Sequence, residues 1–233
     1  MKHLFLILVV ISLTGFGQTA EDYFNSGVTK YELQDYTGSI SDFNNAIELK
    51  PDYAAAYNNR GAAKIDLQDY TGAITDYNKS IQLKPDFANA YYNRGLTKNN
   101  LQDYRGAIAD YNKAIQLKPD YAIAYNNRGA AKSKLEDYRG AIADYNKFIQ
   151  LKPDFAVSYF NRGSAKYNLQ DYRGAIADFS KAIQINPDDA LAYNNRGIAK
   201  FNLKDKNGAC LDWSKAGELG YSDAYTNIQK FCQ

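Results

Sequence analysis

Five prolines recur at intervals of 34 residues: Pro51, Pro85, Pro119, Pro153 and Pro187. Each ends a near-copy of the same stretch, which in residues 57–85 reads YNNRGAAKIDLQDYTGAITDYNKSIQLKP. A fixed period of this length predicts a solenoid, in which every unit buries its apolar face only against its neighbours. Because solenoids mostly present surfaces rather than reactive groups, the period favours a binding function over catalysis.

Residues 88–121 serve as the type unit. Its second half places apolar residues three and four apart, which predicts one stripe of an α-helix: Tyr104, Ala107, Ile108, Tyr111, Ala114 and Ile115. Asp103 precedes this stripe as an expected N-cap, and Pro119 follows where a helix cannot continue. The first half carries Tyr91 and Gly95 four residues apart on one helical face.

A glycine recurs inside every first helix, at Gly27, Gly61, Gly95, Gly129, Gly163 and Gly197. Glycine costs about 1 kcal/mol relative to alanine in a helix interior. Its repetition predicts that the two helices of a unit approach too closely there for a side chain. Each unit is therefore expected to be a helix pair joined by a tight turn.

This pattern resembles that of the tetratricopeptide repeat family. The matching residues of the type unit are Tyr91, Gly95, Ala107, Tyr111, Ala114 and Pro119. The resemblance covers six units, which start at Ala20, Ala54, Ala88, Ala122, Ala156 and Ala190. It implies an all-α, right-handed α-solenoid of six helix-turn-helix units over residues 18–221. The segment 222–233 is expected to form a C-terminal capping helix, since a solenoid must cover its exposed end.

Two positions depart from the family pattern. Arginines stand where leucine is common, at Arg60, Arg94, Arg128, Arg162 and Arg196, and lysines stand where an aromatic is usual, at Lys30, Lys64, Lys98, Lys132, Lys166 and Lys200. Each arginine has a matching aspartate in the second helix: Asp76, Asp110, Asp144, Asp178 and Asp212. The arginines form either a ladder of cations for an acidic ligand or structural bridges to these aspartates, and the matched acids favour the bridges.

Residues 1–17 read as a signal peptide, with Lys2 and His3 before an apolar run and small residues at Gly15 and Gly17. We expect cleavage after Gly17, with Ala20 as the alternative. The run is about ten residues long, too short for the roughly 20 that span a bilayer. A retained membrane anchor is the competing interpretation. The mature chain is therefore expected to be periplasmic or secreted.

Composition argues against several functions. The net charge of +2 falls to about +1 once Lys2 is removed, so no broad attraction to nucleic acid is expected. Cleavage also removes His3, the only histidine and the most common general base and metal ligand. The tyrosines recur with the period, as core residues do. We expect no catalytic site, no metal and no cofactor.

Both cysteines, Cys210 and Cys232, lie near the C-terminus. In an oxidising compartment the simplest prediction is a disulfide between two antiparallel helices. The alternative is a pair of small buried apolar residues.

The family resemblance implies that the first helices line a concave face that holds an extended peptide or a partner helix. One asparagine per unit would face this groove: Asn25, Asn59, Asn93, Asn127, Asn161 and Asn195. A primary amide both donates and accepts, so each can pair with a peptide unit of an extended chain. The alternative is that asparagine is merely a favourable exposed residue at this position.

The predicted groove becomes more apolar toward units five and six, at Ile123, Val157, Phe160, Tyr167, Leu191, Ile198 and Phe201. These residues are expected either to anchor an apolar ligand side chain or to pack adjacent first helices together. The basic residues with which some family members clamp a terminal carboxylate are missing, because Asn58, Ala62 and Ile123 stand among the groove positions.

We therefore expect a non-catalytic protein–protein interaction scaffold. The alternative is a permanent subunit of a cell-envelope complex that acts through its convex face or its cap. The sequence does not indicate an oligomeric state.

Overall fold

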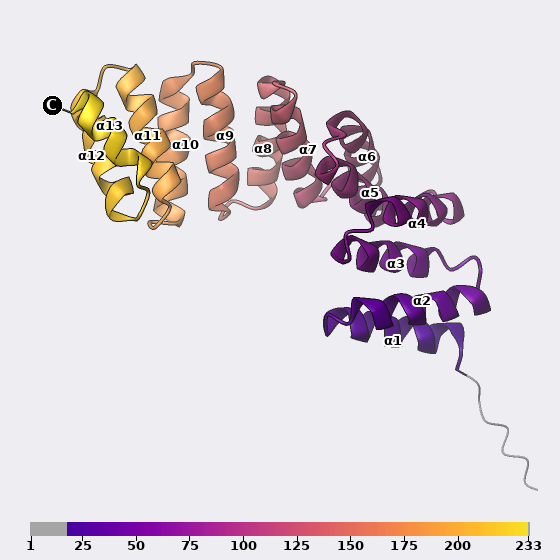
Figure 1. Ribbon diagram of the computed structural model, residues 1–233. Helices are drawn as coiled ribbons and strands as arrows, with labels where there is room; N and C mark the ends of the chain where they lie inside the picture. Colours follow the sequence, from indigo (N-terminus) through magenta and orange to yellow (C-terminus); the bar gives the residue numbers. More distant parts are fainter. Residues whose placement is uncertain (1–17, 233) are drawn as a thin grey trace, which may run out of the picture.

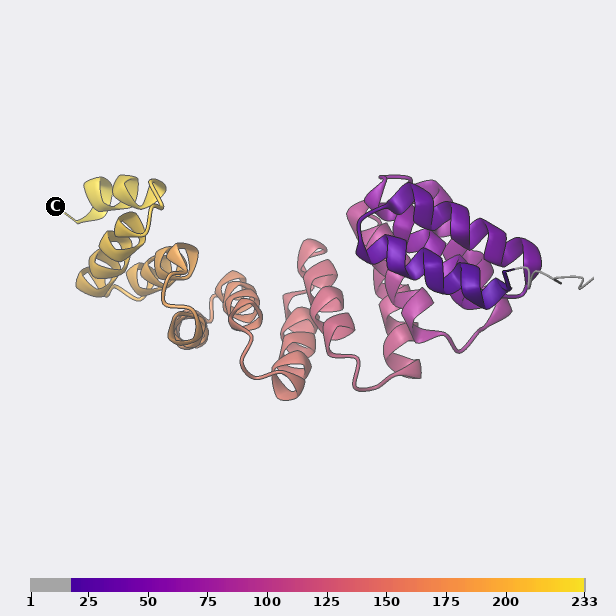
Figure 2. The same cartoon turned by 90° about the horizontal axis from the view of Figure 1, so that it is seen from below.

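The computed structural model describes residues 18–232, which form thirteen α-helices and no strand (Figure 1). The helices run in antiparallel pairs along a curved array, and Figure 2 shows that the array also twists along its length. The predicted all-α solenoid is confirmed. The bounds are α1 (Ala20–Glu32), α2 (Tyr36–Leu49), α3 (Ala54–Asp66), α4 (Tyr70–Leu83), α5 (Ala88–Asn100), α6 (Tyr104–Leu117), α7 (Ala122–Lys134), α8 (Tyr138–Leu151), α9 (Ala156–Asn168), α10 (Tyr172–Ile185), α11 (Ala190–Asn202), α12 (Lys206–Glu218) and α13 (Asp223–Phe231).

Each second helix begins at an aspartate that caps it. In the type unit the Asp103 carboxylate accepts a 2.9 Å hydrogen bond from the Gly106 backbone N–H, which satisfies one of the free donors at the helix start. The same bond recurs in every unit, and the accepting aspartates are Asp35, Asp69, Asp103, Asp137, Asp171 and Asp205. The predicted N-cap is therefore confirmed six times.

The turn inside each unit contains a residue in the left-handed backbone region, although none of the six is glycine. Gln102 has a φ of 61° in the type unit. The equivalent residues are Gln34, Gln68, Gln102, Glu136, Gln170 and Lys204. A tight turn was expected, but a long side chain with positive φ was not, since glycine is the usual residue in this conformation.

The helix-interior glycines mark close contacts, as predicted. A Cβ atom placed on Gly95 would lie 2.9 Å from Cε1 of Tyr111, which no ordinary contact allows. The equivalent glycine of every other unit is just as close to the aromatic ring of its second helix, from Gly27 beside Phe43 in unit one to Gly197 beside Trp213 in unit six. The buried aromatic of each second helix therefore packs directly on the backbone of its first helix.

A buried charge cluster joins the two helices of units two to six. Asp76 is 2% exposed, and Arg60 donates to it from Nε at 2.9 Å and from Nη2 at 2.6 Å. Lys64 completes the cluster, with its Nζ 2.8 Å from Asp76 Oδ2. The predicted arginine–aspartate bridges are thus confirmed, and the lysine is an addition that sequence reasoning missed.

The arginine also reaches the preceding unit. Nη1 of Arg60 donates to Asn44 Oδ1 on α2 at 2.6 Å, and the guanidinium lies over the ring of Tyr57. The equivalent arginines bond the preceding second helix in the same way, at Asn78, Asn112, Asn146 and Ser180. Each of these arginines spends its charge on a buried aspartate and makes three hydrogen bonds inside the protein, which favours the structural role over a cation ladder for acidic ligands.

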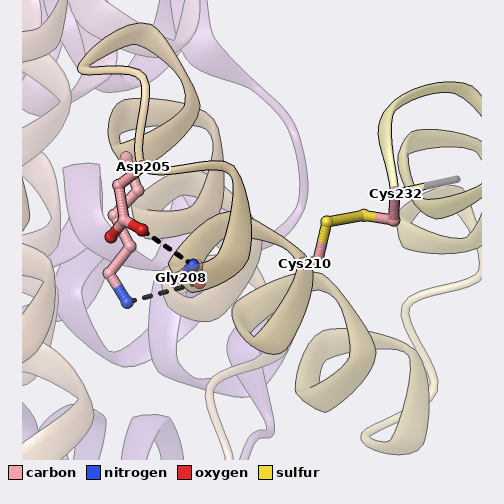
Figure 3. The surroundings of a disulfide bond; sticks show 5 residues. Asp205, Gly208, Cys210 and Cys232 are labelled. Atoms are coloured by element: carbon pink, nitrogen blue, oxygen red, sulfur yellow. Dashed lines mark hydrogen bonds between the residues drawn. A yellow bond between two sulfur atoms is a disulfide. The ribbon is translucent and has the colours of Figure 1, made fainter.

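The C-terminal helix α13 packs on α12 and closes the array. Ala224, Ile228 and Phe231 join an apolar cluster around Trp213, which is 1% exposed. The predicted disulfide is present: Cys210 of α12 bonds Cys232 just beyond α13, with a Cα–Cα distance of 5.8 Å (Figure 3).

The expected signal peptide, residues 1–17, lies outside the described residues. None of the helices between residues 18 and 232 is long and apolar enough to cross a membrane.

We predict that Asp76→Asn lowers the free energy of unfolding by about 3–5 kcal/mol, because it leaves Arg60 and Lys64 partly buried without their counter-charge. Urea unfolding followed by circular dichroism measures the loss. Asp86→Asn, on an exposed loop aspartate, is the matched control and should change stability little. Equal effects of the two variants would contradict a structural role for the cluster.

We also predict that reducing the Cys210–Cys232 bond costs about 3 kcal/mol in the cap, as expected for a loop of this length in the chain-entropy model. Hydrogen exchange of α13 with and without reductant measures the effect. The double variant Cys210→Ser/Cys232→Ser should already show fast exchange and should not respond to reductant. Unchanged protection of α13 after reduction would mean that apolar packing alone holds the cap.

Candidate functional site

The first helices of the units, α1, α3, α5, α7, α9 and α11, lie on the inner side of the curved array. Each of the first five contacts the first helix of the next unit, whereas successive second helices make no comparable contacts. A stack whose members meet on one side only curves toward that side. The surface presented by the first helices, on which successive units meet, is called the inner surface.

The predicted asparagines lie on these first helices, one per unit. Asn25 is exposed, and the others, Asn59, Asn93, Asn127, Asn161 and Asn195, are partly buried between neighbouring first helices. They therefore sit at the junctions between units. This placement makes the neighbouring unit a competitor for their hydrogen bonds.

Two of these asparagines use their N–H donors inside the protein. Asn93 Nδ2 donates to Asn58 Oδ1 at 3.1 Å, and Asn127 Nδ2 donates to the Tyr92 hydroxyl at 3.0 Å. In both cases the acceptor stands 35 residues earlier, on the first helix of the preceding unit. Sequence reasoning did not foresee these bonds between units.

Asn59 and Asn195 differ, because the residues 35 positions before them are Phe24 and Phe160, which offer no acceptor. Their Oδ1 atoms accept from the adjacent Asn58 and Asn194, at 3.0 and 3.2 Å. Their Nδ2 groups donate no hydrogen bond to residues 18–232.

Asn161 makes no side-chain hydrogen bond within the described part of the chain. The residue 35 positions before it is Asn126, whose buried Oδ1 atom has no partner there either. Asn161 therefore keeps both its donor and its acceptor for another molecule.

Sequence reasoning missed a seventh member of the row, Asn227 on α13. Its Nδ2 donates to Asn194 Oδ1 at 3.3 Å, which repeats the bond from Asn93 to Asn58. Asn227 follows Asn195 by 32 residues instead of 34, so a strict 34-residue register passes over it. The cap thus continues the row of amides as well as covering the end of the solenoid.

A cavity of about 210 Å³ opens between α9 and α11. It is lined by Ser164, Tyr167, Asn168, Phe179, Asn195 and Ile198. A smaller cavity of about 120 Å³ lies between α1 and α3, lined by Val28, Tyr31, Phe43, Asn59 and Ala62. A third, of about 230 Å³, lies one unit further on and includes Tyr31, Ala62, Asp66 and Asn93.

The apolar residues predicted for units five and six do not form one continuous patch. Tyr167 and Ile198 line the 210 Å³ cavity, and Leu191 is exposed on α11. Phe160 packs on Phe179 with ring centroids 5.6 Å apart. A separate aromatic cluster holds Phe201, whose ring centroid is 4.5 Å from that of Phe231 in the cap and 5.8 Å from that of Trp213.

Tyr31 has an unusual environment on the inner surface. Its hydroxyl donates to Asp66 Oδ2 at 2.8 Å. Burial, together with this neighbouring carboxylate, raises the pKa of Tyr31 to about 12. The hydrogen bond to Asp66 orients the ring, which lines two neighbouring cavities.

Taken together, this surface offers amide groups and small cavities with mostly apolar linings. Such groups form hydrogen bonds and bury side chains, and none of them is activated for proton transfer or nucleophilic attack. The site is therefore suited to binding.

Comparison with known proteins places the fold. Residues 27–65, 63–101, 99–135 and 163–204 match a TPR repeat family model, and residues 122–155 match a second model, the tetratricopeptide repeat. Among curated proteins, none matches the chain.

Several solved structures are similar. YrrB, a TPR protein with an unusual peptide-binding site, is 21% identical, with a TM-score of 0.74 over 80% of this chain and 97% of YrrB. MamA is 26% identical, with a TM-score of 0.67 over 75% and 96% of the two chains. PilF of Pseudomonas aeruginosa is 16% identical, with a TM-score of 0.76 over 91% and 96%.

These structures share the stacked helix pairs, and the family models match well over half of the residues. The chain belongs to the tetratricopeptide repeat family, whose members are generally non-catalytic scaffolds for protein–protein interaction.

Proposed function

We propose that this protein is a non-catalytic interaction scaffold that binds an extended polypeptide along the inner surface of its first helices. One observation carries the proposal: cavities open between successive first helices, each with a ladder asparagine in its lining. An extended chain exposes a carbonyl and an N–H at every residue, and alternate side chains can enter pockets. The inner surface offers partners for both.

The ladder asparagines can serve a bound backbone in different ways. Asn93 has its donor engaged by Asn58, but its Oδ1 remains an acceptor for a ligand N–H. Asn59 and Asn195 have the opposite arrangement, with Oδ1 engaged and the donor available. Asn161 offers both groups. A ligand backbone would therefore meet a mixture of donors and acceptors, as it does beside a β-strand.

We further propose that residues 1–17 are a signal peptide, that residues 18–221 form the six-repeat solenoid and that residues 222–233 form its cap. The mature protein would then work in the periplasm or outside the cell. The disulfide supports this location, because such bonds persist in oxidising compartments. The resemblance to YrrB, a TPR protein with a peptide-binding site, supports the choice of ligand.

A second function, assembly into a permanent envelope complex through the cap, is favoured by two exposed apolar side chains. Leu211 of α12 is 72% exposed beside the disulfide, and Tyr225 of α13 is 52% exposed. An interface on this end would bury both. Leu211→Ser with Tyr225→Ser would abolish such an assembly and leave binding on the inner surface intact.

We predict that the triple variant Asn93→Ala/Asn127→Ala/Asn161→Ala lowers affinity for the natural partner by about 10- to 100-fold. Each lost hydrogen bond is worth about 0.5–1.5 kcal/mol, and the range given corresponds to about two lost bonds, because both groups of Asn127 are engaged inside the protein. The measurement is in-cell cross-linking followed by mass spectrometry to identify the partner, and then titration of that partner with purified protein.

The matched control is Gln82→Ala/Gln116→Ala/Gln150→Ala, which removes three exposed amides from second helices. Urea unfolding of both triple variants separates lost binding from lost stability, since Asn93 and Asn127 also bond neighbouring units. Unchanged partner affinity in a folded asparagine variant would exclude the inner-surface mechanism.

A further inference from the structure

The cavities at the two ends of the solenoid are copies of one another. Val28, Tyr31, Phe43, Asn59 and Ala62 line the cavity between units one and two. Ser164, Tyr167, Phe179, Asn195 and Ile198 line the cavity between units five and six. Each residue of the second set follows its counterpart by 136 residues, which is four repeats. The same five positions of the repeat therefore build both cavities.

Units one and five share three aromatic residues that set them apart from the other units. The acceptor position, the cavity wall and the cavity floor are Phe24, Tyr31 and Phe43 in unit one and Phe160, Tyr167 and Phe179 in unit five. Units two, four and six have asparagine at the acceptor position instead: Asn58, Asn126 and Asn194. Unit three has Tyr92 there and Asn99 at the wall.

The phenylalanines leave two ladder asparagines without an acceptor on the preceding first helix. A phenyl ring cannot accept the hydrogen bond that Asn58 accepts from Asn93 or that Tyr92 accepts from Asn127. After each phenylalanine, the next ladder asparagine therefore keeps its N–H donor. The two asparagines so affected, Asn59 and Asn195, are the ones that line the copied cavities.

Both donors are also held in a defined orientation. The Oδ1 atom of each asparagine accepts from the preceding asparagine, which fixes the plane of the amide. The tyrosine walls are fixed in equivalent ways: Tyr31 donates to Asp66, and Tyr167 accepts from Asn202 at 3.3 Å, again with partners 136 residues apart. Each cavity is thus a preformed apolar site with one unsatisfied amide donor in its wall.

We propose that these two cavities are equivalent docking sites for one extended, uncharged polypeptide segment, which inserts one apolar side chain into each and accepts a hydrogen bond from Asn59 or Asn195 on the adjoining backbone carbonyl. The proposal rests on the proposed function and specifies its ligand. Apart from these amides and Asn168, whose Nδ2 donates to the Ser164 carbonyl, the linings of both cavities are apolar or hydroxyl-bearing. Neither lining carries a charge, so a charged side chain would lose its hydration without gaining an ionic partner.

The two cavities differ in volume, so they suit side chains of different size. An apolar protein cavity of about 150 Å³ holds a benzene molecule. The cavity between units five and six, about 210 Å³, accepts an aromatic ring, whereas that between units one and two, about 120 Å³, suits an aliphatic side chain. Two anchors on one chain bind more tightly than either alone, because the second contact is intramolecular.

The experiment uses an uncharged fragment, N-acetyl-phenylalanine-N-methylamide, titrated into the purified protein of residues 18–233. Side-chain amide signals are followed by NMR. We expect saturable shifts of the Asn195 amide, with a dissociation constant on the order of millimolar for a ligand of this size. The Asn127 amide, whose donor is engaged, should not respond. The alanine analogue of the fragment, which lacks the ring, should bind at least about tenfold more weakly.

Two variants borrow residues from other units, so that each is already tolerated in the fold. Ser164→Leu places in unit five the residue of unit three, Leu96, and fills the cavity. Phe160→Tyr introduces the acceptor of unit three, Tyr92, which bonds Asn127, and should capture the Asn195 donor. Each should weaken the fragment at Asn195 by about tenfold or more and leave the response of Asn59 unchanged. Ala130→Leu, at the equivalent position of unit four, is the matched control.

Absence of a shift at Asn195, an equal shift at Asn127, or unchanged binding to both cavity variants would overturn the proposal. These outcomes are distinct from failure of the proposed function. Suppose that the triple asparagine variant still loses its partner but the fragment does not bind either cavity. The inner surface then binds a polypeptide backbone without side chains inserted into the cavities. If neither depends on the inner surface, both proposals fail.

Discussion

The buried aspartate of each second helix is the interaction on which the array depends. Asp76 and its equivalents are nearly inaccessible to water, and each is surrounded by an arginine fork and a lysine. A buried carboxylate is stable only when its charge is compensated, so the two helices of a unit must meet in one register. The same arginine then bonds the second helix of the preceding unit. One cluster thereby sets both the pairing within a unit and the stacking between units.

This register determines where the ladder asparagines lie. The asparagine precedes the arginine by one residue in every unit that has the arginine, so fixing the guanidinium also fixes the amide beside it. Unit one has no preceding unit and carries Ser26 instead, which donates to Asp42 at 2.6 Å, while Lys30 keeps its usual contact. Asp42 thus keeps the lysine, but one neutral hydroxyl bond replaces the two bonds and the charge of the arginine fork.

The periodic features of the fold could be predicted from sequence because each is repeated at a constant offset. Capping aspartates, close-contact glycines and arginine–aspartate pairs all recur in step, and the disulfide follows from two cysteines at opposite ends of a helix pair. The hydrogen bonds of the asparagines could not be predicted in this way. They depend on which residue stands 35 positions earlier, and that residue changes between phenylalanine, tyrosine and asparagine from unit to unit.

Departures from the period hid other features. Two differences give Asn227 its spacing of 32 residues. Helix α12 is one residue shorter than the other second helices, and Asn227 is the fifth residue of α13, whereas Asn195 is the sixth residue of α11. The left-handed residues of the turns escaped notice because glutamine, glutamate and lysine give no sign of positive φ. Both features are properties of the backbone, a helix length and a φ angle, which the pattern of side chains does not reveal.

Six copies of one unit in a single chain allow stacking and recognition to be separated. Positions that never change, such as the glycine under the aromatic ring, are held constant by contacts that every unit must make. Positions on the inner surface that change from unit to unit do not make these constant contacts. The acceptor position is one of these: Asn58 and Tyr92 there bond the next asparagine, whereas a phenylalanine offers it no acceptor. A single side chain can therefore convert a junction that closes on itself into one that is open to a ligand, without altering the stack that supports it.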